Sequence, residues 1–245
     1  MTDAEFSVLD TDVAVARATA AHRAYAHVKH LILVNQLTPG SELREAQLTE
    51  TSGYGRTPIR EALRRLVQEG FVEVRPRQGY RVAPVTLSRV RELFEMRMLL
   101  EPVAAELAAS RASQQDLEDL ASLGRQTYPS SDPAGYERFL ADNCEFHARV
   151  AEAAGNSLLA RALRTLLEEM QRLFFISLGP AATEQLHEHH ELYDALLARD
   201  PGRARAIVEA QIESSRQRVL QALMAGERQT SGPISVAART PRSPA

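Results

Sequence analysis

The sequence predicts a mainly α-helical protein of two domains, in which three helices and a small β-hairpin precede an all-α helical bundle. Three observations support this prediction. Apolar residues recur at helical spacing over residues 17–66, alternate with polar residues over 71–82, and return to helical spacing from Thr86 to Ala225. We expect the domains at 16–85 and 86–226, flanked by a disordered N-terminus at 1–15 and a disordered tail at 227–245.

Composition narrows the class of protein. A chain of 245 residues, 44% of them hydrophobic, is long enough to form two cores. The single cysteine, Cys144, excludes an internal disulfide framework and is typical of a reducing compartment. No apolar run approaches the roughly 20 residues that span a bilayer, and the acidic start has no signal-peptide pattern. We therefore expect a cytoplasmic protein without a membrane partner.

The first domain is expected to open with an Ala-rich helix over residues 17–34 and a short helix over Glu45–Thr51. Ser52–Gly55 then forms a tight turn, because glycine tolerates left-handed backbone angles. In the third helix Thr57 is the expected N-cap and Pro58 the first helical residue, where its missing N–H costs nothing.

A β-hairpin follows this third helix. Gly70 ends the helix, and the alternating residues of Phe71–Val74 and Tyr80–Val82 predict two short strands. Arg75–Gly79 joins them, so the hairpin has a basic tip.

The second domain is predicted to be helical throughout. Ser88 is the expected N-cap of its first helix, and Pro102 should kink that helix without ending the domain. Asp200-Pro201 is a strong helix start, and Asn156 is the expected cap of a helix from Ser157. The further helices are expected at Ser113–Leu123, Ala134–Ala154, Ser157–Ile176, Glu184–Ala198 and Pro201–Ala225.

Charge is distributed unevenly between the two domains. The net charge is −3, yet Ala20–Val85 holds ten basic and six acidic residues, a net charge of +4, which leaves −7 for the rest. A basic head on an acidic body is typical of a DNA-binding module. A solvated charged surface remains the alternative interpretation of charge alone.

The order helix, short helix, turn, helix, hairpin predicts a winged helix-turn-helix, whose second turn-flanking helix enters the DNA major groove. Arg56, Thr57 and Arg60 lie at the start of that helix, where the guanidinium fork suits guanine or phosphate and the helix dipole favours phosphate. Arg64 continues the row for phosphate contact at most. The alternative is that Arg60 pairs with Glu61 along the helix surface.

The hairpin tip is the second expected DNA contact, because its glycine permits close approach to the minor groove or backbone. The complete set of predicted DNA-binding residues is Arg44, Arg56, Thr57, Arg60, Arg64, Arg77, Gln78 and Gly79.

Residues 20–85 resemble the DNA-binding domain of the GntR family of transcription regulators. The motifs that carry the resemblance are Leu43–Glu50, Gly53–Leu63 and Glu69–Val72. Two positions depart from the family pattern. Gly55 stands where Ser or Thr is usual, which removes a hydroxyl able to contact phosphate, and Asn35 stands near a usual Gly.

Residues 88–225 resemble the helical FCD domain of the FadR subfamily of these regulators. The segments that carry this looser resemblance are Glu92–Arg97 with Glu101-Pro102, Asn143–His147, Ala153–Asn156, Glu188–His190 and Ala204–Gln211. It implies a homodimeric transcription repressor that binds double-stranded operator DNA and responds to a small organic acid.

The same resemblance implies a divalent metal, Zn, Ni or Mn, held by one Asp and three His inside the bundle. In this sequence the four positions are occupied by Asn143, His147, His189 and Gln211. Two amides in place of a carboxylate and an imidazole predict weak metal binding.

Together with Arg97, these four residues are also the predicted effector site, because Arg97 offers a fork for a carboxylate. The alternative for Arg97 is an ion pair with Glu101, four residues on. The neighbours Asp142, His187 and His190 could substitute as ligands, but Asp142 is off the His147 face by one position, and surface exposure is the alternative for the two histidines. Cys144 is expected to pack as a small apolar residue.

Two other classes of function were weighed against the regulator. A metal-dependent helical-bundle enzyme using His147 and His189 is disfavoured, because no HExxH-type spacing is present. An architectural DNA binder without a ligand is disfavoured by the large helical domain with its polar candidates. We therefore predict a regulator and no catalytic residues.

Overall fold

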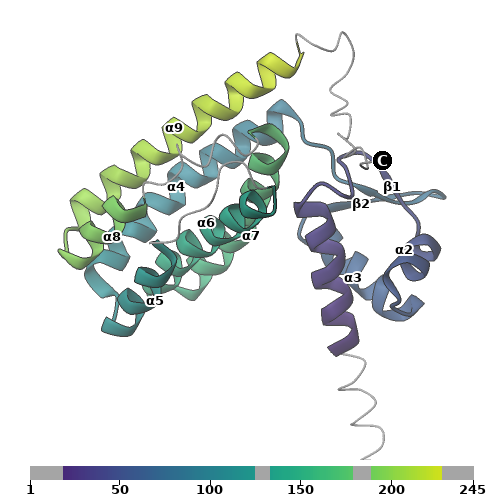
Figure 1. The fold of residues 1–245 in the computed structure, drawn as a ribbon, viewed down its shortest axis with the longest axis horizontal. Coiled ribbons are helices and arrows are strands. Elements are labelled where there is room, and N and C mark those ends of the chain that lie inside the picture. Colours follow the sequence, from purple (N-terminus) through teal and green to yellow (C-terminus); the bar gives the residue numbers. More distant parts are fainter. Residues whose placement is uncertain (1–18, 125–132, 179–188, 228–245) are drawn as a thin grey trace, which may run out of the picture. The chain divides into compact units, whose positions relative to one another are not determined.

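A computed structural model describes residues 19–124, 133–178 and 189–227. The chain divides into two compact units, Met1–Val85 and Thr86–Ala245 (Figure 1). Of the segments predicted to be disordered, 1–15 and 227–245, all but Glu227 lies outside the described residues, and Glu227 is the last residue of the C-terminal helix. Most of the predicted loop between 124 and 133 also lies outside them.

The N-terminal unit contains a helix over residues 19–33, α2 (Glu45–Ser52) and α3 (Arg56–Gln68). Three antiparallel strands, β1 (Glu42–Leu43), β2 (Val72–Arg75) and β3 (Gly79–Val82), form a sheet in the order β1-β3-β2. This is the predicted winged helix-turn-helix. β1 was not predicted, because a strand of two residues is too short to show alternation. Its Leu43 pairs with Tyr80 of β3.

The core of this unit explains the orientation of α3. Ile59, Ala62, Leu63 and Leu66 lie on one face of α3 and are almost fully buried. They pack with residues of the first helix, the sheet and Phe71. Because apolar side chains hold one face of α3 inward, its opposite, basic face must point to solvent.

Two predicted helix caps were wrong. α3 begins at Arg56 with Gly55 as its N-cap, so Thr57 is the second helical residue. Pro58 still sits within the first turn, where backbone N–H groups lack intrahelical partners, so it costs nothing there. In the other unit, Thr86 rather than Ser88 caps the first helix, and its Oγ1 accepts a hydrogen bond from the Arg89 N–H at 3.2 Å.

The turn between α2 and α3 depends on Gly53, which adopts φ +73° as the C-cap of α2. A Cβ there would meet nothing within 4 Å, so the penalty is purely conformational. We expect Gly53→Ala to destabilise the protein by about 1–2 kcal/mol, measured by denaturant unfolding. Gly55→Ala is the comparison: φ is −67° and the new Cβ makes an ordinary 3.8 Å contact with Pro58, so only the smaller loss of a glycine N-cap, at most about 0.5–1 kcal/mol, is expected. Equal losses in both variants would contradict this account of the turn.

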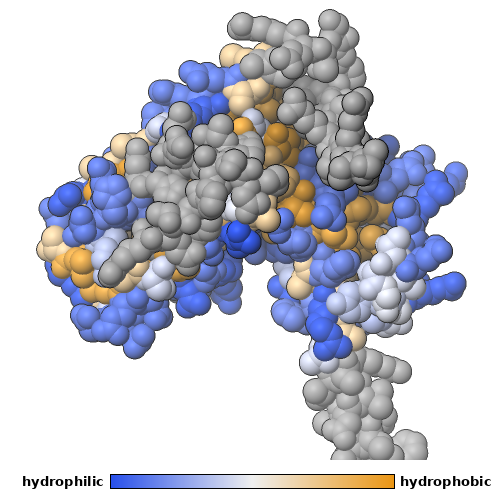
Figure 2. All heavy atoms as spheres, viewed as in Figure 1, coloured by the Kyte–Doolittle hydropathy of each residue, from blue (hydrophilic) through white to orange (hydrophobic). Residues whose placement is uncertain are grey.

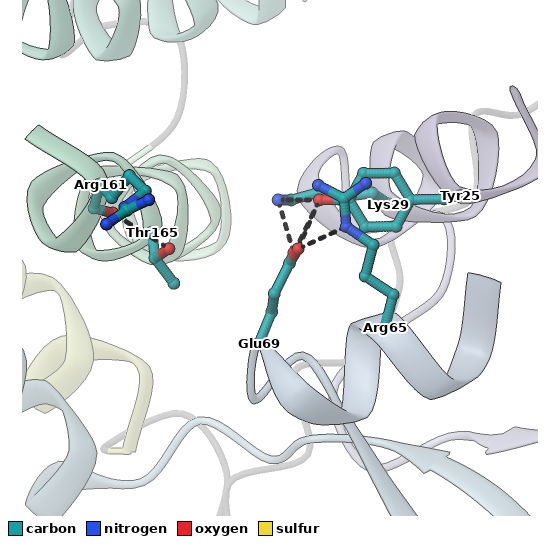
Figure 3. Close-up of polar contacts among 6 residues, drawn as sticks. All are labelled: Tyr25, Lys29, Arg65, Glu69, Arg161 and Thr165. Carbon is teal, nitrogen blue, oxygen red and sulfur yellow. Dashed lines mark hydrogen bonds and ion pairs between the residues drawn. The ribbon is translucent and has the colours of Figure 1, made fainter. Parts of the chain in front are cut away.

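A polar network ties the first helix to the end of α3 (Figure 3). Lys29 Nζ donates to Glu69 Oε2 at 2.8 Å and to Tyr25 Oη at 2.6 Å, and Tyr25 Oη donates to Glu69 at 2.7 Å. Arg65 Nε donates to Glu69 at 2.9 Å, and its guanidinium lies 3.7 Å from the centre of the Tyr25 ring. Lys29 is only 6% exposed, so its charge depends on Glu69.

The C-terminal unit is a bundle of helices arranged around α4 (Leu87–Arg111) (Figure 1). α4 packs against α9 (Pro201–Glu227), and also against α6 (Pro133–Ala153), α7 (Ser157–Ser177) and α8 (His189–Leu197). α5 (Gln114–Gly124) packs on α6 and α8. α4 continues through Pro102, so the proline does not end the helix. Residues 184–188 of the helix predicted at Glu184–Ala198 lie outside the described residues.

Two predicted caps in this unit are confirmed. Asn156 Oδ1 accepts from the N–H groups of Leu158 and Leu159 at 3.1 and 3.2 Å. Asp200 Oδ1 accepts from the Arg203 N–H at 3.0 Å, which anchors the start of α9. Cys144 is buried with Ala104 and neighbouring apolar side chains, in agreement with its expected packing role.

Among the described residues, we find no helix with the length and apolar character needed to cross a bilayer.

Candidate functional site

The basic face of α3 is open to solvent. Arg56, Thr57, Arg60 and Arg64 are all exposed, whereas the buried residues of the same helix lie on its opposite face. Arg44, just before α2, is exposed as well. The N-terminus of α3 therefore presents guanidinium groups and free backbone N–H groups together, an arrangement suited to phosphates and guanine edges.

Arg60 is held by a residue of the preceding helix. Its Nε donates to both Glu45 carboxylate oxygens at 3.3 Å, and its Nη2 donates to Glu45 Oε2 at 3.1 Å. These hydrogen bonds, aided by the carboxylate charge, raise the pKa of Arg60. The predicted alternative partner was Glu61, and the structure pairs Arg60 with Glu45 instead.

The β2–β3 hairpin forms the wing, and Figure 2 shows its outer end as hydrophilic. Arg77, Gln78 and Gly79 at its tip are exposed. Arg77 and Gly79 have φ values of +66° and +90°, and a Cβ on Gly79 would lie 3.4 Å from the Leu43 carbonyl oxygen. The positive φ of Gly79 is strained for any residue with a side chain, so glycine suits this position of the tip.

In the helical unit, Arg97 is buried and bound by protein groups. Its Nε donates to Glu101 Oε2 at 2.5 Å, its Nη2 donates to Glu101 Oε1 at 3.4 Å, and its Nη1 donates to Ser215 Oγ at 3.3 Å. The ion pair with Glu101, which the sequence offered as the alternative role of Arg97, is therefore present in the structure. Ser215 on α9 was not anticipated, because it is 118 residues away in the sequence.

The two histidines of the predicted site lie side by side. The rings of His147 and His189 are 5.3 Å apart between centroids, and His189 also stacks on Phe146. His189 Nε2 is 3.0 Å from Asn143 Oδ1, and His147 Nδ1 is 3.4 Å from Glu101 Oε1. Gln211 is half-buried on α9, beside the buried Ile212. We call Arg97, Glu101, Asn143, His147 and His189 the polar cluster.

One histidine of the polar cluster is held neutral by burial. Burial, with a smaller contribution from the positive charge of Arg97, lowers the pKa of His147 to about 3. His147 is therefore neutral near pH 7, and the charges of Arg97 and Glu101 balance each other. The Arg97–Glu101 ion pair and the neutral His147 therefore offer hydrogen-bond donors and acceptors.

The donor set does not fit the divalent metal that the family resemblance implies. Within the described part of the chain, no three His, Cys, Asp or Glu side chains converge as a metal site. The carboxylate position holds Asn143, whose Oδ1 already contacts His189, and Glu101 is committed to Arg97. Amide oxygens are poor ligands for Zn, Ni or Mn. His190 is exposed, Asp142 half-buried, and His187 lies outside the described residues.

Two apolar grooves in the helical unit are lined by residues outside the polar cluster. One of about 550 Å³ lies between α4 and α9, and includes Phe94, Met98 and Met224. Figure 2 shows hydrophobic surface over this part of α4 and α9. The other, of about 460 Å³, lies between α4 and α7, and includes Met96, Leu99 and Leu166.

Comparison with known proteins matches the two units separately. Residues 20–82 match the family model described as bacterial regulatory proteins, gntR family, and residues 92–214 match the FCD domain. The chain is 30% identical to a probable D-xylose utilization operon transcriptional repressor of Paenarthrobacter nicotinovorans, over 78% of this chain and 84% of the relative.

Two further similarities come from Escherichia coli. The chain is 29% identical to the HTH-type transcriptional regulator McbR of strain K12, over 70% of this chain and 77% of the relative. The solved structure of E. coli McbR/YncC has the same fold, with a TM-score of 0.69 at 24% identity, covering 82% of this chain and 97% of that one.

The winged helix-turn-helix with its exposed basic helix, followed by a helical domain, defines a DNA-binding transcription regulator rather than an enzyme. The chain belongs to the GntR family, and its C-terminal unit is the FCD domain that fits the FadR subfamily.

Proposed function

We propose that this protein is a homodimeric, cytoplasmic transcription repressor that places the N-terminus of α3 in the DNA major groove and is released by a small organic-acid effector. The observation that carries the proposal is the division of α3 into a buried apolar face and an exposed basic face. Repressor names among the relatives support the sign of control, since both GlaR of E. coli and the P. nicotinovorans relative carry them.

Each half of the operator is expected to meet one recognition helix and one wing. Arg56 and Arg60 contact base edges or phosphates in the major groove, Thr57 and Arg64 contact the backbone, and Arg44 supports the approach. Arg77, Gln78 and Gly79 lie against the minor groove or its backbone. A dimer then reads two half-sites related by two-fold symmetry.

Exposed apolar side chains on the helical unit support association of two copies. Met96 and Leu99 on α4 are 45% and 66% exposed, and Leu158 on α7 is 69% exposed. Exposed large apolar side chains on neighbouring helices are typical of an interaction surface. Their burial by a second copy would hold two DNA-binding heads on one molecule, and the oligomeric state is read by light scattering.

The effector is proposed to bind at the polar cluster and beside Gln211. Asn143, His147 and His189 supply hydrogen bonds there, and a carboxylate on the effector must share Arg97 with Glu101. Because the cluster is buried, an effector bound there moves α4, α6 and α8 relative to each other. Such a movement shifts the balance between DNA-competent and released states.

A thermal-shift screen with small carboxylates tests the effector site. A carboxylate present at a concentration of 100 times its dissociation constant stabilises the folded protein by about 2.7 kcal/mol. The Tm of the wild-type protein should therefore rise by several degrees. His189→Ala should abolish the rise. His190→Ala, which removes an exposed histidine on the same helix, should leave it intact. A rise that survives in His189→Ala would move the effector site elsewhere, the α4–α9 groove being the next place to test.

The regulatory function is tested by selecting operator sequences from random duplex DNA with the purified full-length protein. The proposal expects a pseudo-palindromic consensus, and reporter expression that falls when the protein is present. Enrichment of no common sequence would contradict it.

A further inference from the structure

The ion pair between Arg60 and Glu45 joins the two helices of the helix-turn-helix. Glu45 is the first residue of α2, and Arg60 lies in the second turn of α3, 15 residues later. The carboxylate side chain is 27% exposed and the guanidinium side chain 52% exposed. The ion pair therefore fixes the direction in which the Arg60 side chain extends from α3, although about half of that side chain is exposed to solvent.

The geometry engages one edge of the guanidinium and leaves another open. Glu45 accepts hydrogen bonds from Nε and Nη2, the two nitrogens on one side of the planar group. Nη1 makes no hydrogen bond among the described residues. Because the guanidinium carries five N–H donors, the outer edge formed by Nη1 and the second hydrogen of Nη2 remains available as a bidentate fork.

We propose that Glu45 is a positioning residue for DNA recognition, which fixes Arg60 so that its outer edge reads one base pair, most naturally guanine O6 and N7. The inference rests on the proposed role of Arg60 in base contact. Glu45 itself touches no base. It acts by restricting the rotamers of a long side chain before DNA arrives, so that less conformational entropy is lost on binding.

Glu45 also has a purely electrostatic effect on DNA binding, which can be distinguished from its positioning of Arg60. Glu45 repels phosphates and weakens binding to every sequence alike. Through Arg60 it strengthens the hydrogen bonds to one base pair, and only when Arg60 lies opposite that base pair. Removing Glu45 should therefore strengthen non-specific binding slightly while weakening discrimination. Removing an acid without this geometry should strengthen binding to operator and scrambled DNA alike and leave their ratio unchanged.

Glu61 is the matched control, because it is an exposed acid directly beside Arg60 on the same helix. The full-length wild type, E45A, E45Q, E61A, R60A and E45A/R60A are compared by fluorescence anisotropy. The DNAs are a selected operator, its single base-pair variants and a scrambled duplex. Thermal unfolding of each variant confirms folding, and E45Q keeps one acceptor oxygen should E45A fail to fold.

We expect E45A to lower the ratio of operator to scrambled-DNA affinity about tenfold, with the loss concentrated at one base pair in each half-site. E45Q should lose less, E61A should keep the wild-type ratio, and E45A should change the ratio no further in the R60A background. An unchanged ratio in E45A while R60A loses affinity would overturn the role of Glu45 alone. If R60A itself binds the operator normally, both this inference and the proposed base contact of Arg60 fail.

Discussion

Arg56→Ala is expected to weaken operator binding by about 1–3 kcal/mol, or roughly 5- to 150-fold, and to relax base preference at one position in each half-site. Arg56 is the first residue of α3 and is exposed, so no buried packing is lost on truncation. The loss should thus appear in DNA binding and leave thermal stability nearly unchanged. Titration of labelled operator at constant salt measures it.

Arg203→Ala provides the comparison for Arg56→Ala. Arg203 is also an exposed arginine near a helix start, at α9 in the other unit. Arg203→Ala removes the same positive charge as Arg56→Ala, but at a position far from the recognition helix in the sequence. Equal losses of operator affinity in the two variants would show that overall charge, and not the position of Arg56, governs binding.

Glu69→Ala is expected to cause the largest loss of stability in the DNA-binding unit. The substitution removes the carboxylate that accepts hydrogen bonds from the buried Lys29 and from Tyr25 and Arg65. Breaking a buried ion pair costs about 3–5 kcal/mol. We expect a value of about 3 kcal/mol, because the Glu69 side chain is still 19% exposed. Denaturant unfolding monitored by circular dichroism measures the change.

Acid titration gives a second readout of the same network. Burial would raise the pKa of Glu69, but hydrogen bonds from Lys29, Tyr25 and Arg65 outweigh it and lower the pKa below 4.5. The network's contribution is therefore complete above about pH 4.5 and is lost as the pH falls through the lowered value. The difference in free energy of unfolding between the wild type and Glu69→Ala should therefore decrease as the pH falls below about 4.5. Glu50→Ala, at an exposed position of α2, should show neither the loss nor the narrowing.

Local patterns predicted most of the fold. The apolar spacing of Ile59, Leu63 and Leu66 gave the buried face of α3, and Asn156 and Asp200 were found as caps, because the relevant contacts lie within one helical turn. β1 was missed since its pairing partner is far along the chain. The starts of α3 and α4 were each misplaced by two residues, because Gly55 caps α3 without a side-chain hydrogen bond and Thr86 caps α4 in place of Ser88.

The candidate site was predictable as a set of residues but not as a set of partners. The exposed basic row on α3 follows from helical periodicity. The bond between Arg60 and Glu45 does not, because it requires knowing how α2 crosses α3. In the helical unit, spacing allowed the Arg97–Glu101 pair, but the contacts to Ser215 and between His147 and His189 depend on packing of distant helices.

Methylation protection of guanine N7 on a selected operator tests the central claim most directly, because N7 lies in the major groove, where α3 is expected to enter. With wild-type protein at saturation, guanines in two symmetric half-sites should be protected, and Arg56→Ala should lose protection at one guanine in each. A saturated complex in which every major-groove guanine stays reactive would contradict the account.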